Sequence, residues 1–106
     1  MTPEIQPVTP QIPVNVATIA TIGSAQLANG GGHIAGAVVV KVAGSTDCVA
    51  TLYDGTSTSG IPLAQFGCSS VGPASMCSSS FATGLFVNVI GTTAATFDVP
   101  YTGTAA

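Results

Sequence analysis

Only a few side chains in this 106-residue sequence can transfer protons or act as nucleophiles or metal ligands. They are four acids, one histidine and three cysteines: Glu4, Asp47, Asp54, Asp98, His33, Cys48, Cys68 and Cys77. Acid–base and nucleophilic catalysis require such groups in fixed pairs. The many serines include no GxSxG elbow, and His33 is the only base available to a catalytic pair. We therefore expect no enzyme activity and no cofactor, and keep a small hydrolase that uses His33 as the remote alternative.

The three cysteines leave two alternatives open. They contain no CxxC pair and have a single histidine beside them, which argues against a four-ligand zinc site within one chain. Cys68 and Cys77 bracket a Ser-rich segment and could close it with a disulfide. The odd number of cysteines and the lack of an export signal favour reduced, structural thiols instead.

The segment from 51 to 60, "TLYDGTSTSG", places a tyrosine and an aspartate next to a run of Gly, Ser and Thr. Asp54 and Gly55 are a turn-forming pair, since Asp hydrogen-bonds nearby backbone and Gly accepts a positive φ. Tyr53 ends the preceding strand, and Gly60 directly precedes the next one. We interpret the segment as a corner between two strands and not as a reaction site.

Charged residues make up 5% of the chain, against about 25% in typical domains, and the only cation is Lys41. Phosphate and anionic lipid binding both require clustered Lys or Arg, so we expect no nucleic-acid or membrane partner. The longest apolar run, 34–40, is also far shorter than a membrane-spanning helix. A surface with so little charge is easier to understand if partner proteins cover much of it.

Prolines 3, 7, 10 and 13 predict an extended N-terminal arm over residues 1–13. Its apolar side chains Ile5, Val8 and Ile12 are too many for a solvated tail, so we expect them to bind the chain's own domain or a neighbouring subunit. The alternative is an unattached terminus.

Residues 14–106 predict one all-β domain, a small antiparallel β-sandwich or barrel of six to seven short strands. No segment shows a 3.6-residue hydrophobic period bounded by helix-capping residues. In 14–22 the residues Val14, Val16 and Ile22 fall on one face of a half-buried strand, and in 33–44 the residues Val38, Val40 and Val42 point inward. The remaining expected strands are 47–55, 61–66, 81–91 and 94–103.

Turns and loops complete this prediction. A "GSTD" turn is expected to join 33–44 and 47–55 in a hairpin, and a turn at 91–93 to join 81–91 and 94–103 as a closing pair. The three glycines 30–32 are expected to break regular structure, and 67–80 to form a Ser/Gly loop.

Two stretches carry a family resemblance: "GAVVVKVAGSTDCVATLYDGTSTSGIPLAQF" and "FATGLFVNVIGTTAATFDVPY". Together they resemble small virion proteins of tailed bacteriophages, over residues 36–101. The shared motif consists of turn and strand residues, with Tyr53, Asp54, Gly55 and Gly60 as its signature, and carries no catalytic residue.

The resemblance implies a structural role on the virion. We expect a capsid decoration or cement protein that binds the major capsid protein as a symmetric homo-oligomer, with a trimer as the expected order. It would be synthesised in the host bacterial cytoplasm. The alternative is a neck, tail or fibre-associated structural or receptor- or glycan-binding module, whose tip would be the loops at 54–60 and 68–77.

Overall fold

The computed structural model describes residues 14–77 and 79–106, without the side chains of residues 75–77. The described chain folds into nine β-strands and no helix. The strands are β1 (Asn15–Ile19), β2 (Gly23–Ile34), β3 (Gly36–Val42), β4 (Val49–Asp54), β5 (Ile61–Gly67), β6 (Gly72–Cys77), β7 (Ser80–Phe81), β8 (Gly84–Ile90) and β9 (Thr96–Ala105). The predicted all-β class is confirmed, with more strands than the six or seven expected.

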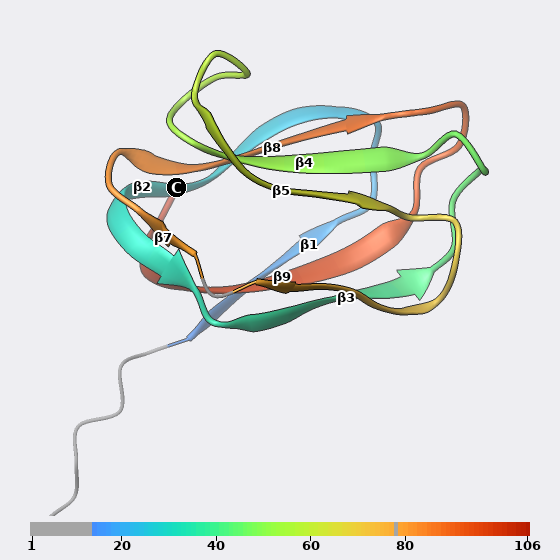
Figure 1. Cartoon of the computed structure of the whole chain (residues 1–106), viewed down its shortest axis with the longest axis horizontal. Helices are drawn as coiled ribbons and strands as arrows, with labels where there is room; N and C mark the ends of the chain where they lie inside the picture. Colours follow the sequence, from blue (N-terminus) through green and yellow to red (C-terminus); the bar gives the residue numbers. More distant parts are fainter. Residues whose placement is uncertain (1–13, 78) are drawn as a thin grey trace, which may run out of the picture.

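All strand pairs are antiparallel and form one sheet that folds over itself. The path of paired strands is β5-β4-β8-β2-β9-β3-β6, while β1 pairs with β9 and β7 with β2. Figure 1 shows the resulting layers, with β4, β5 and β8 in one and β1, β3 and β9 in the other. The two ends of the path, β5 and β6, are in contact, so the sandwich is almost closed into a barrel.

The core lies between these layers and is built by alternation along each strand. Leu85, Val87 and Val89 of β8 point inward and are buried, as period-two patterning requires. Phe66 of β5 packs edge-on against Phe97 of β9, with ring centroids 5.5 Å apart. This aromatic pair joins the two layers across the core.

Two predicted hairpins are wrong, because the chain crosses between layers where we expected it to turn back. β3 pairs with β6 and β9, whereas β4 pairs with β5 and β8. Likewise β8 and β9 share no hydrogen bonds with each other, since β9 pairs with β1, β2 and β3. Turn residues specify that a chain changes direction, but not which strand it then joins.

The glycines at 30–32 do not end regular structure. β2 continues through them, and its pairing with β9 shifts register between Asn29 and His33. Gly30 has φ +75°, a left-handed conformation that glycine adopts without strain. The glycines therefore form a bulge that bends one long strand from the first layer into the second. The expected loop at 67–80 is likewise partly strand, since it contains β6.

Two predictions of side-chain direction are also wrong. Val14 and Val16 face solvent, and the inward residues of β1 are Ala17 and Ile19. Val42 is exposed because the β3–β9 register shifts between Val40 and Val42. The N-terminal arm, with Ile5, Val8 and Ile12, lies outside the described residues.

Candidate partner-binding surface

The loop between β4 and β5 is a corner, as predicted, but Asp54 has a different role from the one expected. Its carboxylate accepts hydrogen bonds from the backbone N–H groups of Ala82 (3.0 Å) and Thr83 (2.9 Å), not from its own turn. These bonds, that of Ala82 first, lower the pKa of Asp54. Asp54 thus fixes the turn that leads into β8.

The other signature residues of this loop are structural as well. Gly55 has φ +150°, and its N–H donates to the carbonyl of Gly84 (3.0 Å). Gly60 lies so close to the backbone of Asp54 that a side chain would collide with it. The ring of Tyr53 packs against that of Phe86, at a centroid distance of 6.4 Å.

Asp47 makes an equivalent clamp at the opposite end of the sandwich. Its carboxylate accepts hydrogen bonds from the hydroxyl of Ser45, from the hydroxyl of Thr92 (2.7 Å) and from the backbone N–H of Thr92 (3.0 Å). The bonds from Ser45 and Thr92 lower the pKa of Asp47 to about 2. Asp47 therefore ties the β3–β4 crossing to the β8–β9 crossing.

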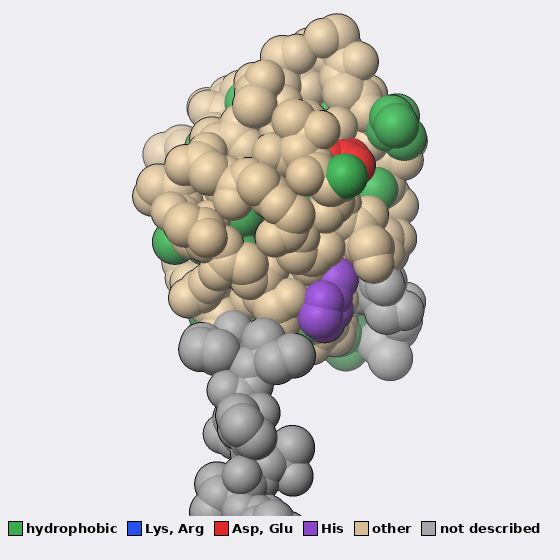
Figure 2. Space-filling model, turned by 90° about the vertical axis from the view of Figure 1, so that its left-hand side faces the viewer, with side chains coloured by type: hydrophobic (Ala, Val, Ile, Leu, Met, Phe, Trp, Pro, Cys, Tyr) green, Lys and Arg blue, Asp and Glu red, His purple; other side chains and the backbone are tan. Residues whose placement is uncertain are grey.

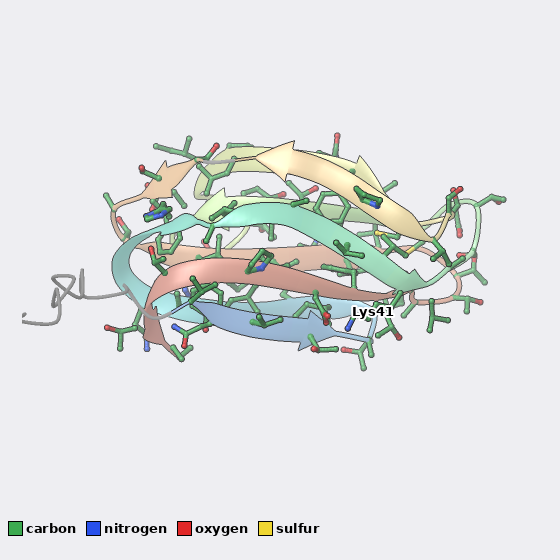
Figure 3. The ribbon with its side chains drawn as sticks, turned by 90° about the horizontal axis from the view of Figure 1, so that it is seen from below. Lys41 is labelled. Atoms are coloured by element: carbon green, nitrogen blue, oxygen red, sulfur yellow. The ribbon has the colours of Figure 1, made fainter. Side chains whose placement is uncertain are left out.

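The third described acid, Asp98, sits on the outer face of the β1-β9-β3 layer. It pairs with the ammonium of Lys41 at 2.8 Å and accepts a hydrogen bond from the hydroxyl of Thr18 at 2.7 Å. Lys41, labelled in Figure 3, belongs to β3, so this network links three neighbouring strands. The Lys41 contacts, and then the Thr18 hydrogen bond, lower the pKa of Asp98.

His33 is half-buried on β2, with its Nδ1 2.9 Å from the hydroxyl of Thr102. None of the three described aspartates is hydrogen-bonded to His33, since each is bonded to other groups. Within residues 14–77 and 79–106, no three His, Cys, Asp or Glu side chains gather as a metal site, and no pocket opens. The described part of the chain contains no helix that is long and apolar enough to cross a membrane.

What the described surface does offer is exposed aliphatic side chains at one end of the sandwich. Ile22, Val42, Val71 and Ile90 are between 42% and 68% exposed, and we call these four residues the apolar rim. Each lies at or beside a strand end on the right of Figure 1, where the chain passes between β1 and β2, β3 and β4, β5 and β6, and β8 and β9.

Strand register places two of the rim residues side by side and the other two at one end of the β3–β6 pair. Gly23 pairs with Val89, so Ile22 lies beside Ile90. Gly72 pairs with Val40, so Val71 and Val42 both lie just beyond this pair, at the same end of β3 and β6. The opposite end, shown in Figure 2, presents mainly backbone and uncharged polar side chains besides the exposed Ile61. The two ends of the domain therefore differ in character.

A second set of exposed aliphatic residues lies on the outer face of β1. Val14 and Val16 are both more than half exposed, and Val16 pairs with Pro100 of β9. β1 pairs on only one side among the described strands, so its other edge keeps free backbone groups. β1 begins at Asn15, two residues after the Pro-rich segment 1–13 of the sequence.

Of the two predicted disulfide partners, Cys68 is a free and fully buried thiol. The side chain of Cys77 lies outside the described residues, so the Cys68–Cys77 bridge stays a prediction. Cys48 is also free and buried.

Comparison with protein-family models, with curated proteins and with solved structures finds no match. The bacteriophage resemblance therefore stays a prediction from the sequence, and any function must be argued from this surface.

Proposed function

We propose that the chain is a structural protein of a tailed-bacteriophage virion, a decoration or cement protein that binds the capsid shell as a symmetric oligomer. The support is of two kinds. The segment 36–101 resembles small proteins of such particles. The described surface suits protein–protein contact better than chemistry, because its aspartates serve as backbone and strand clamps.

The observation that carries the proposal is the apolar rim. Four partly exposed aliphatic side chains at one end of a small domain are the kind of surface that a protein partner covers. The chain has four acids and one cation in total, so charge repulsion does little to prevent such a surface from associating with another protein. An apolar patch on a capsid subunit would be its natural complement.

The arm is the second element of the proposed contact. It leads into β1, whose outer face exposes Val14 and Val16, so Ile5, Val8 and Ile12 would extend the same apolar face onto a neighbouring subunit. Ordering an arm costs about 1 to 2 kcal/mol per residue in backbone entropy, which its apolar contacts must exceed.

The rim is tested by adding purified protein to capsids that lack it and measuring bound copies. Ile90→Ser and Val71→Ser are expected to reduce occupancy at least tenfold. Ile61→Ser is the matched control, because Ile61 is as exposed as Val71 but lies at the opposite end. If the number of bound copies per capsid is the same for all three variants, the rim is not the contact.

The arm is tested separately by deleting residues 2–13. The proposal expects a folded domain with strongly reduced incorporation into particles. Unchanged occupancy would rule out the arm as a clamp while leaving the rim proposal in place.

The second candidate is a tail- or fibre-associated recognition module. It is favoured by the loop at 55–60, which presents the hydroxyl groups of Ser57, Thr58 and Ser59 at the end opposite the rim. Electron microscopy of virions separates the candidates, because decoration predicts many copies on the head and recognition predicts few copies on the tail.

A further inference from the structure

Cys48 and Cys68 face each other across the β4–β5 pair. Val49 pairs with Gly67, so the next facing residues toward the apolar rim are Cys48 and Cys68. The backbone N–H of Cys68 donates to the carbonyl of Cys48 at 3.0 Å, which continues the pairing. Facing, hydrogen-bonded residues in antiparallel strands have Cα atoms about 5.5 Å apart, which lies within the range of disulfides.

The two thiols are also neighbours. Facing residues of an antiparallel pair project to the same side of the sheet, and both side chains are fully buried. Burial, followed by the adjacent Cys48 thiol, raises the pKa of Cys68 to about 11. The Cys68 thiol donates a hydrogen bond to the carbonyl of Phe66 (3.9 Å). The pair therefore lies in the interior in its reduced form.

The surrounding backbone fixes Cys48 in this position. A Cβ at Gly91 would come within 2.7 Å of the Cα of Cys48, and one at Gly44 within 3.0 Å of its Cβ. Both crossings between the layers therefore pack directly on Cys48. Cys68 is held on the other side by its hydrogen bonds to Cys48 and to Gly44.

We propose that Cys48 and Cys68 are a redox pair that forms a disulfide tying edge strand β5 to β4. With a small disulfide such as oxidised glutathione as oxidant, one cysteine thiolate attacks it, forms a mixed disulfide and releases one reduced glutathione. The second cysteine thiolate then attacks the mixed disulfide at the protein sulfur and releases the other. Two protein thiols are oxidised and one glutathione disulfide is reduced to two thiols.

Burial sets the rate of this reaction. Neither thiol is accessible in the closed sheet, so β5 must separate locally before the oxidant can reach either sulfur. β5 is at one end of the strand path and hydrogen-bonds to β4. We therefore expect slow oxidation of the folded protein, accelerated severalfold by urea well below the unfolding midpoint. This inference is independent of the proposed function.

The sequence supplies a clean test of which cysteines are joined. The chain has two methionines, Met1 and Met76, so cyanogen bromide cuts it internally only after Met76. That cut separates Cys77 from the other two cysteines. Folded protein is oxidised with glutathione disulfide, remaining thiols are alkylated, and the fragments are weighed by mass spectrometry without reduction.

A Cys48–Cys68 bridge predicts two separate fragments, with 2–76 lighter than its reduced form by two hydrogens and 77–106 alkylated. A Cys68–Cys77 or Cys48–Cys77 bridge would leave the fragments joined and would overturn the proposal. Stable glutathione adducts without a bridge, or no oxidation of the folded protein at any sub-denaturing urea concentration, would overturn it too.

Three variants give a second readout. Oxidation is expected to raise the melting temperature of the wild type and of Cys77→Ala alike, by roughly 10 °C. Cys48→Ala and Cys68→Ala are expected to show no such rise. Should either buried variant fail to fold, the fragment masses of the wild type and of Cys77→Ala still decide the outcome.

Discussion

The three consecutive glycines of β2 give the sharpest test of the fold, because the structure assigns each a different environment. A Cβ at Gly32 would overlap the carbonyl oxygen of Thr102 and come within 2.8 Å of the Phe81 ring. A Cβ at Gly31 would meet atoms only at ordinary contact distances, 3.5 Å and beyond. A Cβ at Gly30 would meet nothing, but φ there is +75°.

These environments predict three different outcomes for substitution by alanine. Gly32→Ala should lower the free energy of unfolding by more than about 3 kcal/mol, since the obstacle is backbone of the paired strand β9 and cannot rotate away. Gly30→Ala should cost about 1 kcal/mol through left-handed strain. Gly31→Ala should be neutral or stabilise by up to about 1 kcal/mol, because alanine restricts the unfolded chain.

Urea unfolding followed by circular dichroism measures all three variants under one set of conditions. Thermal melts should rank them in the same order, at about 4 °C per kcal/mol. Gly31→Ala is the matched control, since it makes the same chemical change one residue away. If the free energies of unfolding of Gly32→Ala and Gly31→Ala differ by less than about 0.5 kcal/mol, the close approach of β2 and β9 is refuted.

Three further predictions concern the clamps and the core. Asp54→Ala should lower the melting temperature more than Asp54→Asn, because asparagine keeps an acceptor for the N–H groups of Ala82 and Thr83; thermal melts of both variants decide this. The depressed pKa values of Asp47, Asp54 and Asp98 mean that the unfolded chain binds protons first as pH falls. Their contributions should therefore be present above the unfolded pKa of about 4 and decrease as the pH falls below it, with that of Asp47 lost as the pH approaches 2; urea midpoints across this range would show this. Phe97→Ala should cost about 3 to 5 kcal/mol by equilibrium unfolding, because it leaves a cavity between the layers opposite Phe66.

Strand identity could be predicted from the sequence because it depends on local pattern. The alternation in 84–90 and the Asp-Gly pair at 54–55 specify a strand and a corner without reference to the rest of the chain. Both are present in the structure. The burial of Val38 and Val40 was predictable for the same reason.

Partner choice between strands could not be predicted, because it depends on contacts far apart in the sequence. Asp54 and Asp47 look like local turn residues, yet they bind residues 82–84 and residue 92. Those bonds hold together crossings between layers that the sequence pattern predicts as simple hairpins. The apolar rim was missed for a related reason, since its four residues come together only when those crossings meet at one end.

β1 shows how the direction of a strand face can be misread. Its valines alternate as a buried face would, but its inward side chains are Ala17 and Ile19. Period-two alternation establishes that one face is apolar, and not which layer covers it. In β1 no described layer covers the valine face.

The edges of the sheet bear on how a chain with so little charge avoids unwanted pairing. β5 and β6 contact each other, and each contains a proline, Pro62 or Pro73, that cannot donate to an added strand. β1 has no proline within 15–19, and its outer face exposes aliphatic side chains. Of these three edge strands, β1 is therefore the least protected against an added strand. On the proposed function this edge is where a neighbouring subunit would bind, and Val16→Lys should reduce assembly without lowering the melting temperature of the isolated domain, because Val16 is 60% exposed.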